Sequence, residues 1–168
     1  MLFTDEVKDM SELIEKLATM NTKLSKIKVA AVCFIFDKDG NLILHRRGPG
    51  ARDAVGKLQA IGGSVNNDDV SFRDALAREL TEEAGNSANI CVDGFVGALL
   101  DGKVDRYSGE YVDWIILAYY GTLESGELIN SEPERCIGFE KAPLTGFSDE
   151  DLSDTAKIFI KQLIDIKK

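Results

Sequence analysis

Histidine and cysteine are scarce in this chain of 168 residues. His45 is its only histidine, and the three cysteines Cys33, Cys91 and Cys136 show no Cys-x-x-Cys or Cys/His spacing. Metal sites that need several histidines or paired cysteines are therefore excluded. Because the cysteines are odd in number, far apart and set in or beside apolar runs, we expect three buried free thiols and no disulfide framework.

A surplus of positive charge is also missing. The chain has 20 Lys and Arg against 29 Asp and Glu, which gives a net charge of -9. Nucleic acid polymers and anionic membranes attract basic patches, so we expect neither as a partner. No apolar run is long enough to cross a bilayer and no leader pattern is visible, so we expect a cytoplasmic protein. A small anionic partner would need local basic residues and a metal.

The apolar residues that are present suffice for one substantial core. They make up 44% of the chain, and nothing in the sequence indicates a second folded domain. From Asp5 to Leu24 apolar residues recur at helical spacing, which predicts an amphipathic helix. We assign residues 1–26 to a helical extension and residues 27–168 to the main domain.

Strand and helix patterns alternate in the main domain. The run from Val29 to Phe36 is continuously apolar and rich in β-favouring residues, as is typical of a central strand covered on both faces. A turn over residues 39–41 leads into Leu42–Leu44 and predicts a hairpin. Residues 111–120 predict a second strong strand, and the polar residues 101–110 before it predict a flexible loop. A final helix is expected to be capped by Ser148 with Asp151. The pattern predicts one α/β domain.

A helix with an unusual acidic face follows Ser71, its expected N-cap, and ends at Gly85. Rotating by about 100° per residue places Glu79 and Glu83 on the side that carries the apolar stripe. That stripe consists of Ala75, Leu76 and Leu80. Surface charges fit this pattern poorly, and like charges four residues apart repel, so a bound cation would relieve a local penalty.

These residues resemble the signature of the Nudix hydrolases. The signature reads Gly, five residues, Glu, seven residues, then Arg-Glu-apolar-x-Glu-Glu-x-Gly-apolar, and the chain matches its second half from Arg78 to Gly85. The first half departs from it, because Val70 stands where the signature has Glu and one extra residue lies between Gly63 and Arg78. Asp69 is the nearest acidic substitute, and we expect its side chain, rather than that of Val70, to face the glutamates and Arg78. The last apolar position is Asn86.

The resemblance implies an α/β/α sandwich with a mixed sheet and hydrolysis of a pyrophosphate bond. The expected substrate is a nucleoside triphosphate or a nucleoside diphosphate derivative, and the expected cofactor is Mg²⁺, with Mn²⁺ as the alternative. Glu79, Glu82, Glu83 and the carbonyl of Gly62 would hold the metal. Glu82 is also the candidate acceptor of the water proton, as are carboxylates outside the signature: Asp101, Asp105, Glu110 and Asp113.

Arginines supply the remaining candidate groups. Arg78 is expected to orient the acidic cluster through a bidentate pair. Arg46 and Arg47, which precede a polar loop, are either a phosphate clamp or ordinary surface charges. The run from Glu132 to Glu140 resembles a segment of some nucleotide-cleaving Nudix hydrolases that leads into a strand beside the base pocket. Phe139 in this run is either a core aromatic or a platform for a base, and Lys141 stands where the segment usually has a second aromatic residue.

Two other functions compete with hydrolysis. The missing signature Glu at Val70 favours a catalytically weak Nudix domain that binds or senses a nucleotide or sugar phosphate. An isoprenyl diphosphate isomerase of the same fold would need additional metal-binding histidines, which a chain with one histidine lacks. A homodimer is left open by the sequence.

Overall fold

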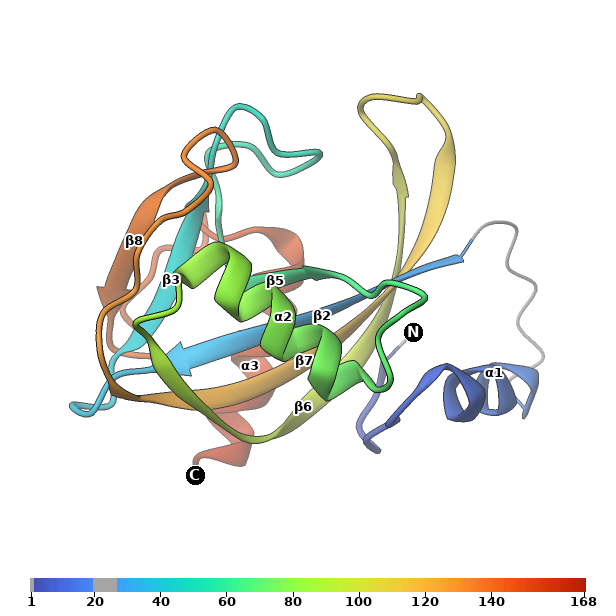
Figure 1. The fold of residues 1–168 in the computed structure, drawn as a ribbon, viewed down its shortest axis with the longest axis horizontal. Coiled ribbons are helices and arrows are strands. Elements are labelled where there is room, and N and C mark those ends of the chain that lie inside the picture. Colours follow the sequence, from blue (N-terminus) through green and yellow to red (C-terminus); the bar gives the residue numbers. More distant parts are fainter. Residues whose placement is uncertain (1, 20–26) are drawn as a thin grey trace.

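A computed structural model of the chain describes residues 2–19 and 27–168. Eight strands and three helices occupy these ranges (Figure 1). In chain order they are β1 (Leu2–Phe3), α1 (Met10–Thr19), β2 (Ile27–Phe36), β3 (Leu42–Arg47), β4 (Leu58–Gln59), β5 (Ile61–Ser64), α2 (Phe72–Ala84), β6 (Asn89–Val104), β7 (Tyr111–Ser125), β8 (Cys136–Ala142) and α3 (Asp154–Ile166).

The strands form one mixed sheet. Its main path runs β1-β6-β7-β2-β3-β4, with β5 paired to β2 and β8 paired to β3. The pairing of β2 with β7 is parallel, and the other pairings are antiparallel. Only β2, in the middle of this path, has almost its whole length buried, as its continuous apolar sequence predicts.

One edge of β2 serves two partners. Residues Ala30 to Cys33 pair with β5, whereas Ile35 and Phe36 pair with β3. The sheet is therefore forked, and β3 and β5 diverge from β2 in different directions. The fork leaves room for a cavity beside the first half of β2.

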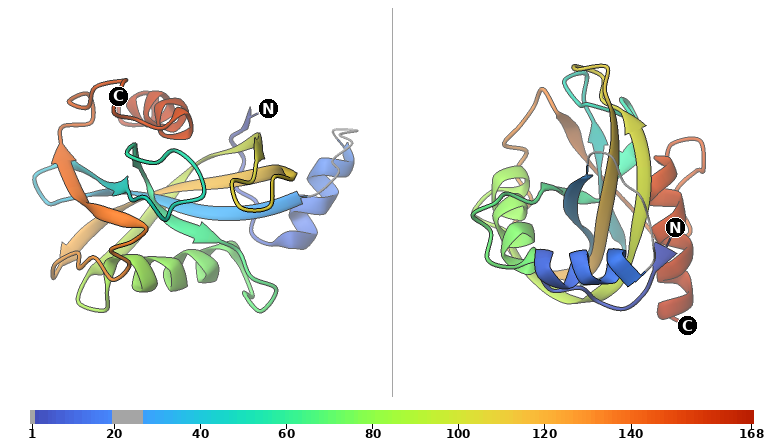
Figure 2. Two further views of the ribbon diagram at one scale, coloured as in Figure 1. Left: turned by 90° about the horizontal axis from the view of Figure 1, so that it is seen from above. Right: turned by 90° about the vertical axis from the view of Figure 1, so that its right-hand side faces the viewer.

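Two helices cover the two faces of the sheet (Figure 2). Phe72, Leu76 and Leu80 of α2 pack in one core cluster, and Phe159 and Leu163 of α3 pack in the other. The predicted α/β/α arrangement with a mixed sheet is confirmed. None of the helices in the described ranges has the length and apolar character needed to span a membrane.

The N-terminal helix is shorter than the sequence pattern predicted. It begins at Met10, so Asp5 to Asp9 are not helical, and Leu24 lies outside the described residues. Leu13 is the helix residue that is buried, and it joins the cluster on the α2 side of the sheet. Ile14 is 60% exposed, so the predicted apolar stripe is only partly covered.

Three further sequence expectations are corrected. Cys91 is exposed, although Cys33 and Cys136 are buried and all three cysteines are free. The segment from Asp101 to Val104, expected to belong to a flexible loop, continues β6 as a strand. The cap of the last helix is Ser153, whose hydroxyl accepts a hydrogen bond from Ala156 N–H, and not Ser148.

Candidate active site

A cavity of about 590 Å³ lies at the fork of the sheet. One wall is formed by α2 with Gly62 and Gly63 of β5, and another by the loop of residues 48–57 with the end of β6. Apolar side chains of β2 and β7, namely Val32, Trp114 and Ile116, line the floor between them. The cavity therefore combines a polar rim with an apolar floor, as small-molecule sites do.

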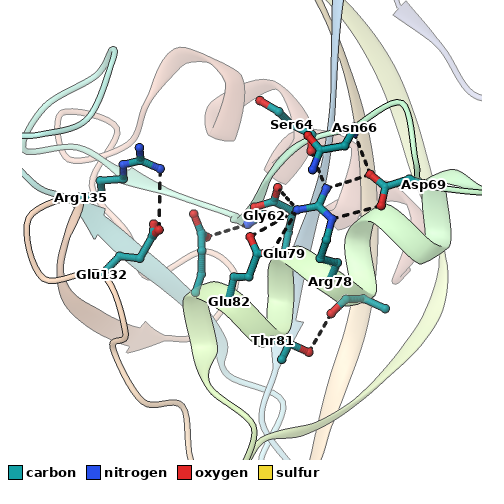
Figure 3. Close-up of polar contacts among 12 residues, drawn as sticks. Gly62, Ser64, Asn66, Asp69, Arg78, Glu79, Thr81, Glu82, Glu132 and Arg135 are labelled. Atoms are coloured by element: carbon teal, nitrogen blue, oxygen red, sulfur yellow. Dashed lines mark hydrogen bonds and ion pairs between the residues drawn. The ribbon is translucent and has the colours of Figure 1, made fainter.

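Arg78 lies behind the α2 wall and, without lining the cavity itself, is the centre of a cluster of carboxylates (Figure 3). Its guanidinium donates to Glu79 at 2.7 Å and to Glu82 at 3.3 Å. It also donates to both oxygens of Asp69, at 3.1 and 2.8 Å, and to the Ser64 carbonyl at 2.9 Å. The predicted contact of Asp69 with Arg78 is thus confirmed, and one cation orients three carboxylates.

The residue at the missing signature position does not reach this cluster. Val70 is 85% exposed, whereas the Asp69 side chain is 9% exposed in its pair with Arg78. The extra residue is absorbed before the helix, because Ser71 caps α2 as predicted by accepting from Asp74 N–H. The hydrogen bond from Arg78 lowers the pKa of Asp69.

Glu83 lies in the same wall, with its side chain 16% exposed. One of its oxygens accepts a hydrogen bond from Gly62 N–H at 3.0 Å. Burial, with the nearby charges of Glu79 and Glu132, raises the pKa of Glu83 to about 7. Burial likewise raises the pKa of Glu79. Several carboxylates in one partly dry space repel one another, which a cation would reverse.

Two glycines allow the carboxylates to approach the sheet this closely. Gly62 has a φ of 143°, and a Cβ there would overlap with the Ala31 carbonyl. A Cβ on Gly63 would overlap with the Glu79 carboxylate. Gly62 is therefore required by the close approach of β5 to β2, and Gly63 leaves room for the Glu79 carboxylate beside β5.

The loop wall carries the basic groups. Arg47 donates to the Asp53 carbonyl and to its carboxylate, each at 2.8 Å, and Lys103 lies 2.7 Å from the other carboxylate oxygen. Both cations line the cavity. Arg46 does not line it, because its guanidinium is held by Glu140 of β8 and by the Gly56 carbonyl. Of the two arginines predicted as a phosphate clamp, the fold brings only Arg47 to the cavity.

The loop of residues 48–57 is tied to the β6–β7 hairpin. The Tyr107 hydroxyl donates to the Gly50 carbonyl at 2.7 Å, and Arg106 donates to the Pro49 and Ala51 carbonyls at 3.1 and 3.2 Å. Among the carboxylates proposed outside the signature, Asp105 lines the cavity, whereas Asp101, Glu110 and Asp113 do not. Phe139 packs against the core on the α2 side and is not part of the cavity.

The donor chemistry of the α2 wall fits a divalent cation. Carboxylate oxygens of Glu79, Glu82 and Glu83 are the hard ligands that Mg²⁺ and Mn²⁺ prefer. Within residues 2–19 and 27–168, no three acidic, histidine or cysteine side chains already converge as a finished ligand set. Arg78 holds Glu79 and Glu82, and Gly62 N–H holds Glu83, so binding an ion requires these side chains to exchange partners.

The family model described as the NUDIX domain matches residues 26–163. The chain belongs to the Nudix family. The CTP pyrophosphohydrolase of Escherichia coli (strain K12) is 31% identical to it over 121 residues, which span 68% of this chain and 84% of that protein. The predicted class, a Nudix pyrophosphohydrolase, follows from these two matches. Enzymes of this family generally use divalent metal ions.

Solved structures show the same Nudix fold. The MutT protein of Methanosarcina mazei Go1 superimposes with a TM-score of 0.68 at 20% identity, covering 88% of this chain and 100% of that one. The MutT Nudix hydrolase of Burkholderia pseudomallei gives a TM-score of 0.64 at 22% identity, covering 83% of this chain and 99% of that one. At these identities the likeness shows the fold alone.

Several cavity residues were not singled out from sequence. Asp53, Lys103 and Trp114 come from segments far apart in the chain, and Glu132 and Arg135 line the cavity from the β7–β8 connection. None belongs to a motif of fixed spacing. The unusual burial of His45, the single histidine, is visible only after folding.

Proposed function

We propose that this Nudix protein hydrolyses a pyrophosphate bond of nucleoside triphosphates or nucleoside diphosphate derivatives with Mg²⁺ as its metal. The observation that carries the proposal is that acidic and basic side chains face one cavity from two different walls. Glu79, Glu82 and Glu83 stand on one side, and Arg47 and Lys103 on the other. A polyphosphate with a bound cation has the two charges that such walls complement.

The cavity residues would have different roles in the reaction. Glu79, Glu82, Glu83 and the carbonyl of Gly62 would hold Mg²⁺, which when bound neutralises phosphate charge and lowers the pKa of a water. Glu82, the most exposed of the three glutamates at 52%, would take the proton of the attacking water. Arg78 keeps the glutamates oriented, and Arg47 and Lys103 would bind phosphate oxygens.

The apolar floor supports a nucleoside as the remaining part of the substrate. Trp114, Ile116 and Val32 present a surface against which a planar base can pack. The relative from Escherichia coli is named a CTP pyrophosphohydrolase, so pyrimidine nucleoside triphosphates are the first substrates to test. Attack of water on phosphorus would then break the pyrophosphate bond and release the nucleoside monophosphate and pyrophosphate.

The test is a panel of nucleoside triphosphates and nucleoside diphosphate derivatives with Mg²⁺ or Mn²⁺. We expect Mg²⁺-dependent release of nucleoside monophosphate, and its loss in Glu83→Gln. Glu127→Gln is the matched control, because Glu127 is exposed and does not line the cavity. Equal turnover in both variants would show that the acidic wall is not the site.

A second function rests on one specific observation. The position that carries Glu in the signature is the exposed Val70, so no carboxylate enters the cluster from it. A catalytically weak domain that binds or senses a nucleotide or sugar phosphate would show tight, Mg²⁺-dependent binding in calorimetry with no product for any member of the panel. Tight binding without product would show that the protein binds a nucleotide or sugar phosphate and does not hydrolyse it.

A further inference from the structure

His45 is a buried polar residue to which the proposed function assigns no role. It lies on β3, is 2% exposed and lines the cavity. Neither of its ring nitrogens has a hydrogen-bond partner among the described residues. Buried polar atoms are normally satisfied, and one left unpaired costs free energy. The position therefore calls for a partner that enters the cavity or moves within it.

The nearest ionisable partner of His45 is Glu83. Its Nδ1 lies 3.9 Å from a carboxylate oxygen of Glu83, just beyond hydrogen-bond distance. That same oxygen accepts from Gly62 N–H at 3.0 Å. A small movement of Glu83 toward the cavity would let Nδ1 replace or join the backbone donor.

The imidazole is suited to this role by its chemistry and by its place beside the Glu83 carboxylate. A neutral imidazole carries one N–H donor and one acceptor, and the group beside each nitrogen selects the tautomer. A carboxylate beside Nδ1 selects the form with its proton on Nδ1.

We propose that His45 is a positioning residue of the active site, whose Nδ1–H holds the Glu83 carboxylate in the orientation that hydrolysis requires. This inference rests on the proposed function, since it assigns Glu83 a part in it. His45 touches neither the water nor the phosphorus in this role. Its effect passes through Glu83 alone.

A second buried group provides the contrast. The Tyr119 hydroxyl on β7 is fully buried and also lacks a hydrogen-bond partner among the described residues. Tyr119 does not line the cavity and packs against Phe95 in the core. Tyr119→Phe is therefore a matched control for removing an unpaired buried polar atom without touching the site.

The first test is spectroscopic and needs no turnover. Because His45 is the only histidine, long-range ¹H–¹⁵N spectra of the ¹⁵N-labelled wild type contain a single imidazole pattern. At about pH 8 we expect the Nδ1–H tautomer, because Nδ1 faces the Glu83 carboxylate. Adding Mg²⁺ or introducing Glu83→Gln should shift both ring nitrogens. A pattern of the Nε2–H tautomer that ignores both changes would overturn the inference.

The second test separates the two ring nitrogens by substitution. The amide of Asn reaches the place of Nδ1, and the amide of Gln reaches the place of Nε2. We expect His45→Leu and His45→Gln to lower kcat about tenfold with little change in KM, which corresponds to about 1.4 kcal/mol. His45→Asn should recover kcat to within about threefold of wild type, and Tyr119→Phe should leave both constants unchanged.

The outcomes distinguish this inference from the proposed function. If the wild type hydrolyses nucleotides and His45→Leu keeps its kcat, or if His45→Asn is as slow as His45→Leu, the positioning role is wrong and the hydrolase stands. If the wild type hydrolyses nothing in the panel, the proposed function is wrong. The tautomer and its response to Glu83→Gln then still decide whether His45 orients Glu83.

Discussion

Beside the α2 wall of the cavity three carboxylates share one guanidinium, whereas on the loop wall two cations pair with two carboxylates. Asp69, Glu79 and Glu82 are grouped around Arg78. Arg47 pairs with Asp53, and Lys103 pairs with both Asp53 and Asp101. The α2 wall therefore keeps a surplus of negative charge, to which Glu83 adds, whereas the cations of the loop wall are matched by carboxylates.

This difference indicates how each wall would respond to a ligand. Charges of one sign held together lower the stability of the free protein, and opposite charge from a ligand removes that cost. A divalent cation matches the surplus of the α2 wall. A phosphate chain at the loop wall would instead take Arg47 and Lys103 from their carboxylate partners.

The largest effect is expected from weakening the acidic wall. Glu83→Gln and Glu82→Gln should each lower kcat by about 100-fold or more while leaving the folded structure nearly intact, because they remove charge stabilisation in the transition state. Steady-state kinetics with circular dichroism as the folding control measures this. Turnover within a few fold of wild type in both variants would contradict the assignment.

Metal linkage tests the same wall without turnover. Mg²⁺ at about 100 times its dissociation constant should stabilise the wild type by ~2.7 kcal/mol and raise its melting temperature. The double variant Glu79→Gln/Glu83→Gln should respond much less. Equal shifts in both proteins would point to a nonspecific salt effect, for which Na⁺ at matched ionic strength is the control.

The Asp69 contact predicts an intermediate loss. Asp69→Asn removes a charged partner of Arg78, so transition-state stabilisation should fall by ~1–3 kcal/mol, less than for Glu82 or Glu83. The ratio kcat/KM of the variant measures it. Asp68→Asn is a suitable control, because Asp68 is exposed and does not line the cavity. No loss in Asp69→Asn would show that Arg78 needs only the glutamates.

The loop wall predicts a pH-dependent effect on stability. Burial acts to raise the pKa of Asp53, but Lys103 and Arg47 outweigh it and the pKa is lowered. A lowered pKa stabilises the folded state above the unfolded pKa of about 3.9, and this contribution is lost as pH falls through the folded value. Asp53→Asn should therefore cost ~0.2–1 kcal/mol at pH 7 and less at pH 3. Equal costs at the two pH values would contradict the ion pair.

The smallest effect is expected at the departure from the signature. Val70 points away from the cluster and Asp69 already fills the place beside Arg78, so Val70→Glu should leave kcat/KM within about twofold. A large gain in turnover would show that the natural chain lacks a carboxylate its site can still use. That result would favour the binding or sensing function over hydrolysis.

Local signals of fixed spacing were read correctly from sequence. The Ser71 cap, the acidic face of α2 and the central strand β2 depend on near neighbours, and each lies where it was predicted. The cap of α3 was misplaced because tertiary contacts decide between two similar serines. Ser153 N–H donates to the Leu58 carbonyl, which keeps this stretch extended until the helix begins. Ser148 instead begins a turn, closed by Asp151 N–H.

The rest of the site consists of residues that are far apart in the sequence and meet only in the folded chain, so no motif of fixed spacing predicts them. Asp53 meets Lys103 only because residues 48–57 cross to the end of β6, and Arg46 turns away because Glu140 of β8 lies beside it. His45 and Arg47 reach the cavity as residues two apart on one strand, whereas Arg46 between them faces the opposite way. The sequence alone did not show which side chains of β3 face the cavity, because this depends on the strands that pair with β3.

The forked edge of β2 has a consequence for how enzymes of this shape diversify. Gly62 and Gly63 are locked into the sheet by the pairing of β5 with β2, whereas residues 48–57 form no strand and are held by contacts with Lys103, Arg106 and Tyr107 at the β6–β7 hairpin. A change of length in that loop should therefore reshape the mouth of the cavity while the glutamates of α2 keep their register. Under the proposed function, substrate choice and hydrolytic chemistry would thus depend on separate stretches of the chain.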